Sequence, residues 1–267
     1  MLDEVEAQFL ADGFAVVPIP GVRERLHAGL VAFERLIANA EDLGRIGRVK
    51  IRKSDLVEMD ATGWSWGCDH IYSPDLREQV LLDLVSLAPI PCLMRRILGD
   101  RVRFSGGHGH WSPVSYDYYL HWHRDTRRER WHLGNPDPRP HVQVCLALTN
   151  EAVVRVVPGS HLRNLESWEH GYISTNPHGD HPNQLIAYIP AGSALLLNTY
   201  SFHRAQCEKE TVRRSLHYGF TRVGSESEPG RQGKVLEWIR EPAFLFNQSA
   251  FLRECIEEQI KEQDGVT

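Results

Sequence analysis

LIAYIPAGSALLLNTYSFHRAQCEKETVRRSLHYGFTR, residues 185–222, is the stretch that decides the fold. Three β-type runs lie within it, at 185–189, 194–199 and 215–222, and clusters of Pro, Gly and polar residues separate them. The same pattern comes before this stretch, in short runs at 101–105, 116–123, 141–149 and 153–157. Several short strands with turn signals between them are typical of a β-sandwich or a β-barrel.

The chain before Gly99 is different, because its apolar residues recur at helical spacing. Leu26, Leu30, Phe33 and Ile37 are spaced by four, three and four residues, which predicts an amphipathic helix. Helical patterns cover residues 3–12, 22–40, 74–98 and, near the end of the chain, 246–262. This order predicts an α+β protein with a mainly β core, a double-stranded β-helix (jelly roll, cupin-like) with supporting helices. Pattern alone leaves other α+β layouts open.

We expect one domain over residues 1–267. Residues 1–99 would be mainly helical support, 100–223 the β-helix core and 224–267 a C-terminal extension. The sequence shows no internal repeat, low-complexity tract or linker that would divide it. Barrels and sandwiches of this length commonly fold as one unit.

The overall charge is mildly negative, −5 at neutral pH, which argues against nucleic acid as a partner. One local cluster, Arg124, Arg127, Arg128 and Arg130, fits either a solvated loop or an anionic substrate. The five cysteines are odd in number and lack CxxC spacing, which argues against a disulfide framework and a zinc site.

The N-terminus has no signal-peptide pattern, and no run approaches the roughly 18 apolar residues of a membrane span. We therefore expect a cytoplasmic protein without a membrane partner. The sequence does not indicate the oligomeric state.

Two H-x-D triplets occur among the 14 histidines. Alternate residues of a strand point the same way, so H-x-D at a strand end supplies two adjacent metal ligands. A ferrous site needs two imidazoles and one carboxylate on one face, which leaves positions for co-substrate and dioxygen. His123-Arg124-Asp125 closes a β-type run, whereas His178-Gly179-Asp180 lies between prolines in a turn-rich segment. The first triplet therefore has the better context.

A third ligand and an anion-binding group follow in the second half of the chain. His203 comes just after the strand 194–200, and Arg214 begins the next strand eleven residues later. If Arg214 points inward, it needs an anionic partner, because burying an unpaired charge is costly. The distal carboxylate of 2-oxoglutarate is a candidate for this partner. The alternative is an exposed Arg214 with Arg213 as the anchor.

Four other polar residues lie in segments near the expected site. His110 and Gln143 are weaker candidates for polar contacts to the co-substrate. His217 lies on the opposite face of its strand from Arg214 and is expected to be structural, as is His161 in the turn Val157-Pro158-Gly159-Ser160-His161.

With these motifs in order, the chain resembles the phytanoyl-CoA dioxygenase-like branch of the Fe(II)- and 2-oxoglutarate-dependent dioxygenases. The resemblance rests on five segments: Phe9-Leu10-Ala11-Asp12-Gly13-Phe14-Ala15-Val16-Val17, the triplet His123-Arg124-Asp125, the Pro-Gly-Ser-His turn at 158–161, Pro190-Ala191-Gly192-Ser193 before His203, and Arg214-Ser215. One segment departs from the family pattern. Thr149-Asn150-Glu151-Ala152-Val153-Val154 stands where a Gly-containing acidic stretch is usual, which puts the substrate-side loop in doubt.

The resemblance implies Fe(II) bound by His123, Asp125 and His203, with 2-oxoglutarate held by Arg214 and dioxygen as the oxidant. It implies oxidation of a C–H bond, by hydroxylation or ring closure, with release of succinate and CO2. Halogenating relatives have a small residue where Asp125 stands, so halogenation is not expected. Aromatic residues flank the segments expected around the site and suit a small polar substrate, such as a glycoside or another natural-product intermediate: Trp64, Trp66, Trp111, Trp122 and Trp131.

Two other readings remain open. His121 and His123 with Glu129 faintly resemble the ligands of a cupin that does not use 2-oxoglutarate, although the spacing to Glu129 is too long. A non-catalytic binding protein on the same scaffold is the other. Conversion of 2-oxoglutarate to succinate would distinguish all three.

Overall fold

The computed structural model describes residues 1–53, 65–125, 141–225 and 237–265. Its helices are α1 (Leu2–Asp12), α2 (Pro20–Glu24), α3 (Leu26–Arg45), α4 (Gln79–Leu84), α5 (Ile90–Leu98), η2 (Ser160–Leu162), α6 (Gly171–Ser174), η3 (Glu237–Arg240), α7 (Pro242–Phe246) and α8 (Ala250–Gln263). Its strands are β1 (Phe14–Pro18), β2 (Ile51–Lys53), β3 (Ser65–Asp69), β4 (Val102–Trp111), β5 (Tyr118–Tyr119), β6 (His141–Ala147), β7 (Glu151–Val156), β8 (Leu185–Ile189), β9 (Ser193–Asn198), β10 (His203–Cys207) and β11 (Arg214–Arg222).

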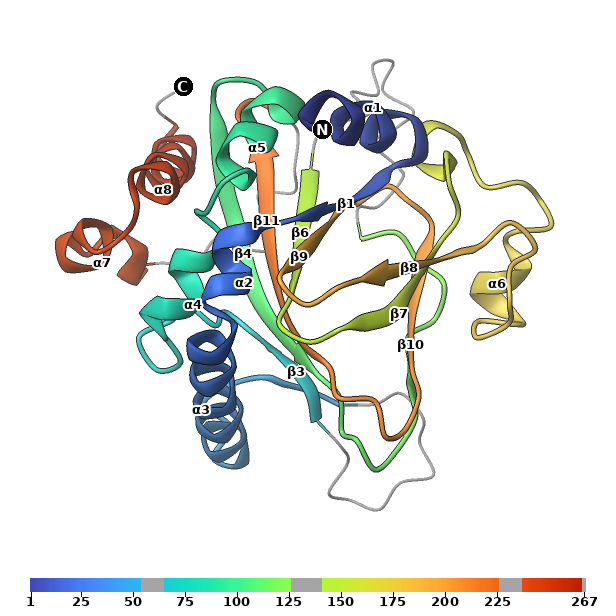
Figure 1. The fold of residues 1–267 in the computed structure, drawn as a ribbon, viewed down its shortest axis with the longest axis horizontal. Coiled ribbons are helices and arrows are strands. Elements are labelled where there is room, and N and C mark those ends of the chain that lie inside the picture. Colours follow the sequence, from blue (N-terminus) through green and yellow to red (C-terminus); the bar gives the residue numbers. More distant parts are fainter. Residues whose placement is uncertain (54–64, 126–140, 226–236, 266–267) are drawn as a thin grey trace.

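The strands form two antiparallel sheets that pack against each other (Figure 1). The larger has the order β1-β9-β6-β11-β4-β3-β2, and the smaller has the order β5-β10-β7-β8. One buried apolar cluster takes members from both sheets, among them Cys145 and Leu195 from the larger and Val154 and Ile189 from the smaller. The prediction of a mainly β jelly roll is confirmed.

The helices cover the other face of the larger sheet. Helices α1, α3, α5 and α8, from both ends of the chain, contribute to one apolar cluster with β4, β6, β9 and β11 (Figure 1). The first 99 residues are more than helical support, because β1, β2 and β3 extend the larger sheet at both edges. Segment 45–72, which has no strand pattern in the sequence, supplies β2 and β3.

Both faces of the larger sheet are therefore buried, and alternate residues of each strand face different layers. In β11, Leu216, Tyr218 and Phe220 belong to the cluster beneath the helices. Ser215 and His217, of the opposite parity, are buried polar residues. The site lies on this second face, between the two sheets.

Hydrogen bonds and close packing at Gly13 connect the end of α1 to the segments that carry the site. Gly13 ends α1 with φ of +82° and donates its N–H to the carbonyl of Phe9. Its own carbonyl accepts from Asn198 N–H at 2.9 Å and from Ser201 Oγ at 3.1 Å. His161 lies 3.2 Å through Nε2 from the carbonyl of Leu10. The Pro-Gly-Ser-His turn thus packs on the end of α1, and the contact of His161 is a structural one.

Gly13→Ala should destabilise the fold more than the same change at another left-handed glycine. A Cβ at Gly13 would collide with Ser201 Oγ and His161 Nδ1, whereas at Gly47, with φ of +71°, it would meet nothing within 4 Å. We expect a loss of about 2–4 kcal/mol in unfolding free energy for Gly13→Ala and about 1–2 kcal/mol for Gly47→Ala. Urea denaturation measures both, and equal losses would contradict the collision.

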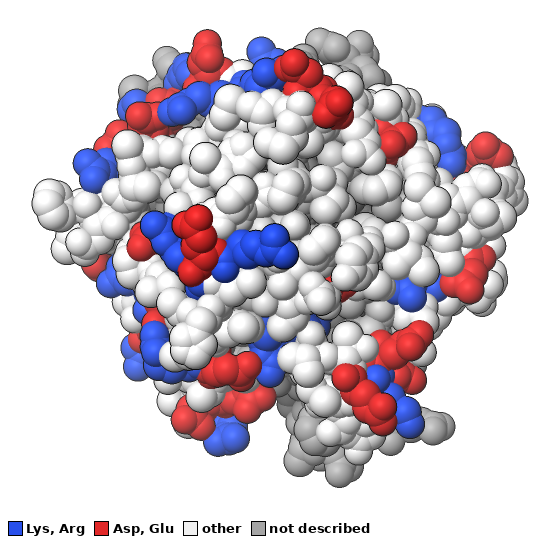
Figure 2. All heavy atoms as spheres, in the orientation of Figure 1, with Lys and Arg blue, Asp and Glu red and all other residues white. Residues whose placement is uncertain are grey.

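The surface carries mixed charge. On the face shown in Figure 2, acidic and basic side chains lie together in small mixed clusters, with uncharged surface between them. Ion pairs of the protein include Arg35 with Glu78, and Arg96 with Asp3 and Glu6. Among the helices of the described residues, none combines the length and the apolar character that a membrane span requires.

Candidate metal centre

Three side chains from two distant segments of the chain, His123 and Asp125 from one and His203 from the other, meet at one end of the space between the sheets. His123 Nε2 lies 3.3 Å from one carboxylate oxygen of Asp125, and His203 Nε2 lies 3.9 Å from the other. An isolated β-bridge joins the two histidines, with reciprocal backbone hydrogen bonds of 2.9 and 3.0 Å. Among the described residues, His123, Asp125 and His203 form the group of His, Asp, Glu and Cys side chains whose ligand atoms lie close enough together to hold a metal ion.

Backbone carbonyls fix the tautomer of both histidines. His123 Nδ1 lies 2.8 Å from the carbonyl of His121, and His203 Nδ1 lies 2.9 Å from that of Ser201. A carbonyl only accepts, so each Nδ1 carries a proton, and in the neutral ring Nε2 then presents its lone pair. Both lone pairs are directed to the space beside Asp125, as a metal ion requires.

The electrostatics of the cluster favour the metal-binding forms of His203 and Asp125. His123 differs, because burial would lower its pKa but Asp125 outweighs burial and raises it, so a metal ion must displace a proton where this imidazole is protonated. Burial and the neighbouring His123 lower the pKa of His203 to about 4, which keeps its imidazole neutral. Burial alone would raise the pKa of Asp125, but His203 and His123 outweigh it and hold the pKa well below its usual range. The cluster therefore offers two nitrogen donors and one anionic oxygen donor.

Aromatic side chains support the two histidines from behind. Trp122 and Phe202, the residues before His123 and His203, are buried and stack with ring centroids 5.0 Å apart. Trp122 Nε1 donates to the carbonyl of Gly179 at 2.8 Å. Each aromatic ring thus fixes the strand whose next residue points into the site.

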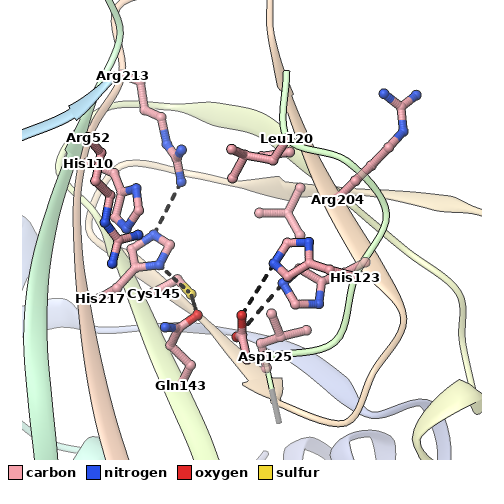
Figure 3. A pocket seen from close by; sticks show the side chains of 14 residues that line it. Arg52, His110, Leu120, His123, Asp125, Gln143, Cys145, Arg204, Arg213 and His217 are labelled. Carbon is pink, nitrogen blue, oxygen red and sulfur yellow. Dashed lines mark hydrogen bonds and ion pairs between the residues drawn. The ribbon is translucent and has the colours of Figure 1, made fainter. Parts of the chain in front are cut away.

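Polar side chains of β6, of β11 and of the residue just before β11 lie across the pocket from the metal-binding cluster. Figure 3 shows Arg213, His217, Cys145 and Gln143 opposite Asp125. Arg213 Nη2 lies 3.2 Å from His217 Nε2, and His217 Nδ1 lies 3.5 Å from Cys145 Sγ. A guanidinium only donates, so His217 Nε2 accepts and its proton is on Nδ1. His217 is thus part of the pocket as well as of the core.

Arg213 is buried and held on three sides. Its Nε donates to Glu151 at 3.0 Å, its Nη1 donates to the hydroxyl of Tyr118, and its Nη2 donates to His217. Burial lowers the pKa of Arg213, but Tyr118 and Glu151 outweigh this and raise it, so the group is charged. This is a fixed cation in a cavity that also contains the metal-binding cluster.

The inward orientation expected for Arg214 is wrong. Its guanidinium lies at the surface, where Nε donates to Glu34 at 2.6 Å. Arg214 shares its strand face with Leu216 and Tyr218, and that face packs toward the helices. Arg213 has the opposite parity and therefore points between the sheets. Of the two arginines, Arg213 is the pocket residue, which was the alternative reading.

His110 and Gln143, the weaker sequence candidates, both line the pocket that contains the metal-binding cluster. His110 packs against His217 with ring centroids 4.2 Å apart and stacks on Trp66 at 5.3 Å. Its Nδ1 is buried and has no hydrogen-bond partner among the described residues. Gln143 Oε1 lies 3.8 Å from Cys145 Sγ.

The second H-x-D triplet is not brought to the cluster. Asp180 is exposed and accepts from Arg204 at 2.7 Å, and His178 packs against Tyr119. Some sequence candidates lie outside the described residues: Trp64, Glu129, Trp131 and the arginines at 127, 128 and 130.

Sequence reasoning missed Arg52, which lines the pocket, and Tyr118 and Glu151, which hold Arg213. Arg52 lies over the ring of Trp66, pairs with Asp69 and lines the cavity, although its segment has no clear pattern. Tyr118 and Glu151 meet only through Arg213. For Glu151 a signal existed, since it lies in the segment that departs from the family pattern.

Comparison with known proteins identifies the architecture. No family model and no curated protein matches the sequence. Among solved structures, AviO1 from Streptomyces viridochromogenes Tue57 superimposes with a TM-score of 0.64 at 18% identity, over 86% of this chain and 98% of that one. The chain has the same fold as this protein.

Two further solved structures match over a similar share of the chain. SnoN, a non-haem alpha-ketoglutarate-dependent epimerase from nogalamycin biosynthesis, matches with a TM-score of 0.55 at 15% identity, over 83% of this chain and 81% of SnoN. HygX from Streptomyces hygroscopicus, solved with nickel and 2-oxoglutarate bound, matches with a TM-score of 0.53 at 17% identity, over 83% and 87% of the two chains. At these identities the likeness establishes the fold.

Proposed function

We propose that this protein is an Fe(II)- and 2-oxoglutarate-dependent oxygenase. The observation that carries the proposal is the pairing of two sites in one pocket. Two oriented imidazole nitrogens and a carboxylate meet at one end, and the buried cation Arg213 lies across from them. The first set fits ferrous iron, and the second fits a carboxylate. The shared fold with SnoN and HygX supports this combination.

His123, Asp125 and His203 would hold the iron on one face. The iron, when bound, would supply the oxidising chemistry with dioxygen and 2-oxoglutarate, which is converted to succinate and CO2. The carbonyls of His121 and Ser201 keep the imidazoles in the metal-binding tautomer. The aromatic pair behind them keeps the two strands in register.

Arg213 would hold the distal carboxylate of 2-oxoglutarate. Its Nη groups face Tyr118 and His217, and the tip of the guanidinium points into the pocket (Figure 3). His110 and Gln143 line the same space and offer polar contacts to the co-substrate. Arg213 thus takes the role of binding the co-substrate carboxylate that the sequence suggested for Arg214.

The substrate we propose is a small polar molecule, such as a glycoside or another natural-product intermediate, oxidised by hydroxylation or ring closure. Arg52 brings a cation to the pocket, and its guanidinium lies over the buried ring of Trp66. The short motifs shared with the phytanoyl-CoA dioxygenase-like branch support membership of that branch. Asp125 occupies the position that a halide would need, so we expect no chlorinated product.

The test is conversion of 2-oxoglutarate to succinate by the Fe(II)-loaded protein. We expect slow turnover alone and faster turnover with polar substrates from a panel of glycosides, amino acids and acyl thioesters, with chloride present. Stimulation only by acyl thioesters, or a chlorinated product, would contradict the substrate proposal. If the iron-loaded protein neither binds nor consumes 2-oxoglutarate, a cupin-type enzyme or a binding protein is the better assignment.

A further inference from the structure

Glu151 places a second charge beside Arg213. Its side chain is buried at the start of β7, and one carboxylate oxygen accepts from Arg213 Nε at 3.0 Å. The other oxygen, Oε1, is buried without a hydrogen-bond partner among the described residues. Arg213 therefore already has a counter-ion before any ligand enters the pocket.

The charges at this end of the pocket do not balance once a carboxylate binds. Arg213 and an ionised Glu151 sum to zero, and the distal carboxylate of 2-oxoglutarate would leave one uncompensated negative charge. Such a charge is costly away from water. The other cations that line the pocket, Arg52 and Arg204, are already paired with Asp69 and Asp180. Because a guanidinium also stays protonated, one added proton on a neighbouring group is what restores neutrality.

Few neighbouring groups can gain that proton. The groups whose charge acts on Glu151, or on which it acts, are Arg213 just before β11, Tyr118 on β5, Cys145 on β6 and Cys207 on β10. Burial raises the pKa of Tyr118, Cys145 and Cys207, so all three already carry their protons. Glu151 is the acid of this group with an oxygen left open for a proton.

The neighbouring histidines are poorer acceptors. Burial holds the pKa of both His110 and His217 well below the usual range. The unprotonated nitrogen of His217, Nε2, lies 3.2 Å from the guanidinium of Arg213. A proton on Nε2 would therefore place two cations against each other. His110 lies against His217, with ring centroids 4.2 Å apart, and shares that electrostatic environment.

We propose that Glu151 takes up one proton from solvent when a carboxylate of the co-substrate binds Arg213, and so acts as a positioning residue that keeps this end of the pocket neutral. The inference rests on the proposed function, because it takes 2-oxoglutarate as the ligand of Arg213. A proton on Oε1 leaves the hydrogen bond from Arg213 to the other oxygen intact.

The direction of the pH effect follows. Burial already raises the pKa of Glu151, against the opposing effects of Arg213 and the Ser215 hydroxyl, and a bound carboxylate raises the pKa further. Between the free and the bound pKa, binding carries a proton with it. The affinity for 2-oxoglutarate should therefore fall as pH rises, by at most about tenfold per pH unit, and level off outside that window.

The experiment is calorimetric titration of 2-oxoglutarate into the Mn(II)-loaded, anaerobic protein, at several pH values and in buffers of different ionisation enthalpy. We expect about one proton taken up per ligand within the window and none in Glu151→Gln, whose affinity should not vary with pH. The matched control is Glu169→Gln. Glu169 is also buried and paired with an arginine, Arg163, but lies away from the pocket, so this variant should behave as the wild type.

An infrared difference spectrum on binding gives a second readout. The wild type should gain the C=O band of a protonated carboxyl group, and Glu151→Gln should not. Binding of 2-oxoglutarate without proton uptake in the wild type would overturn the inference and leave the role of Arg213 standing. Uptake that persists in Glu151→Gln would assign the proton to another group and also overturn it. Absence of 2-oxoglutarate binding altogether would refute the proposed function as well.

Discussion

Arg213→Ala is expected to weaken 2-oxoglutarate binding by about 3–5 kcal/mol, because it removes the buried cation that faces the co-substrate carboxylate. Iron binding should be retained, because the guanidinium of Arg213 donates its hydrogen bonds to Glu151, Tyr118 and His217 and to none of the three metal-binding residues. Calorimetric titration with each ligand separates the two effects.

The neighbouring arginine provides a matched control. Arg214→Ala removes an ion pair with Glu34 that lies outside the pocket, so it should leave 2-oxoglutarate affinity unchanged. Arg213→Lys tests the same point if the alanine variant folds poorly, because it keeps the charge beside Glu151 but loses the planar fork. Weakened binding in Arg214→Ala with none in Arg213→Ala would favour the orientation read from the sequence.

His203→Ala should abolish turnover and lower the affinity for Fe(II) at least about a hundredfold, because loss of a direct ligand exceeds the loss of an outer-shell partner. His123→Ala and Asp125→Ala should do the same, since the three donors act together. Fe(II) titration under anaerobic conditions and succinate release provide the two measurements.

The second H-x-D triplet supplies the control for this set. Asp180→Ala removes a carboxylate from the same kind of motif, but in a loop where it pairs with Arg204. It should leave Fe(II) affinity unchanged. Full activity in His203→Ala would refute the ligand assignment, and loss of iron in Asp180→Ala but not in Asp125→Ala would select the other triplet.

Much of the fold could be predicted because its signals are local. Most strands between Val102 and Arg222 show as short apolar runs between turn residues, and α3 shows as a repeat of three and four. Strand β10 (His203–Cys207), which is largely polar, was not predicted. Strands β2 and β3 could not be found this way. They are short, lie at the edge of the sheet and owe their conformation to strand pairing, β3 with β4 and β2 with β3.

The candidate metal ligands follow from the sequence for the same local reason. His123 and Asp125 are two residues apart at the end of an extended segment, and His203 begins the strand that follows β9. The geometry adds the reciprocal backbone bonds that bring the two segments together. Their role as ligands remains a proposal, which the titrations above test.

The sequence by itself determined the sheet-rich core, the order of its strands along the chain and the residues that offer donors to a metal. Only the tertiary structure decided which face of β11 meets the pocket. Period-two alternation states that Arg213 and Arg214 point in opposite directions, but both faces of this strand are buried, so apolar pattern cannot distinguish them. Packing decided it: helices cover one face and the second sheet covers the other. That same packing brings Glu151, distant in the chain, against Arg213.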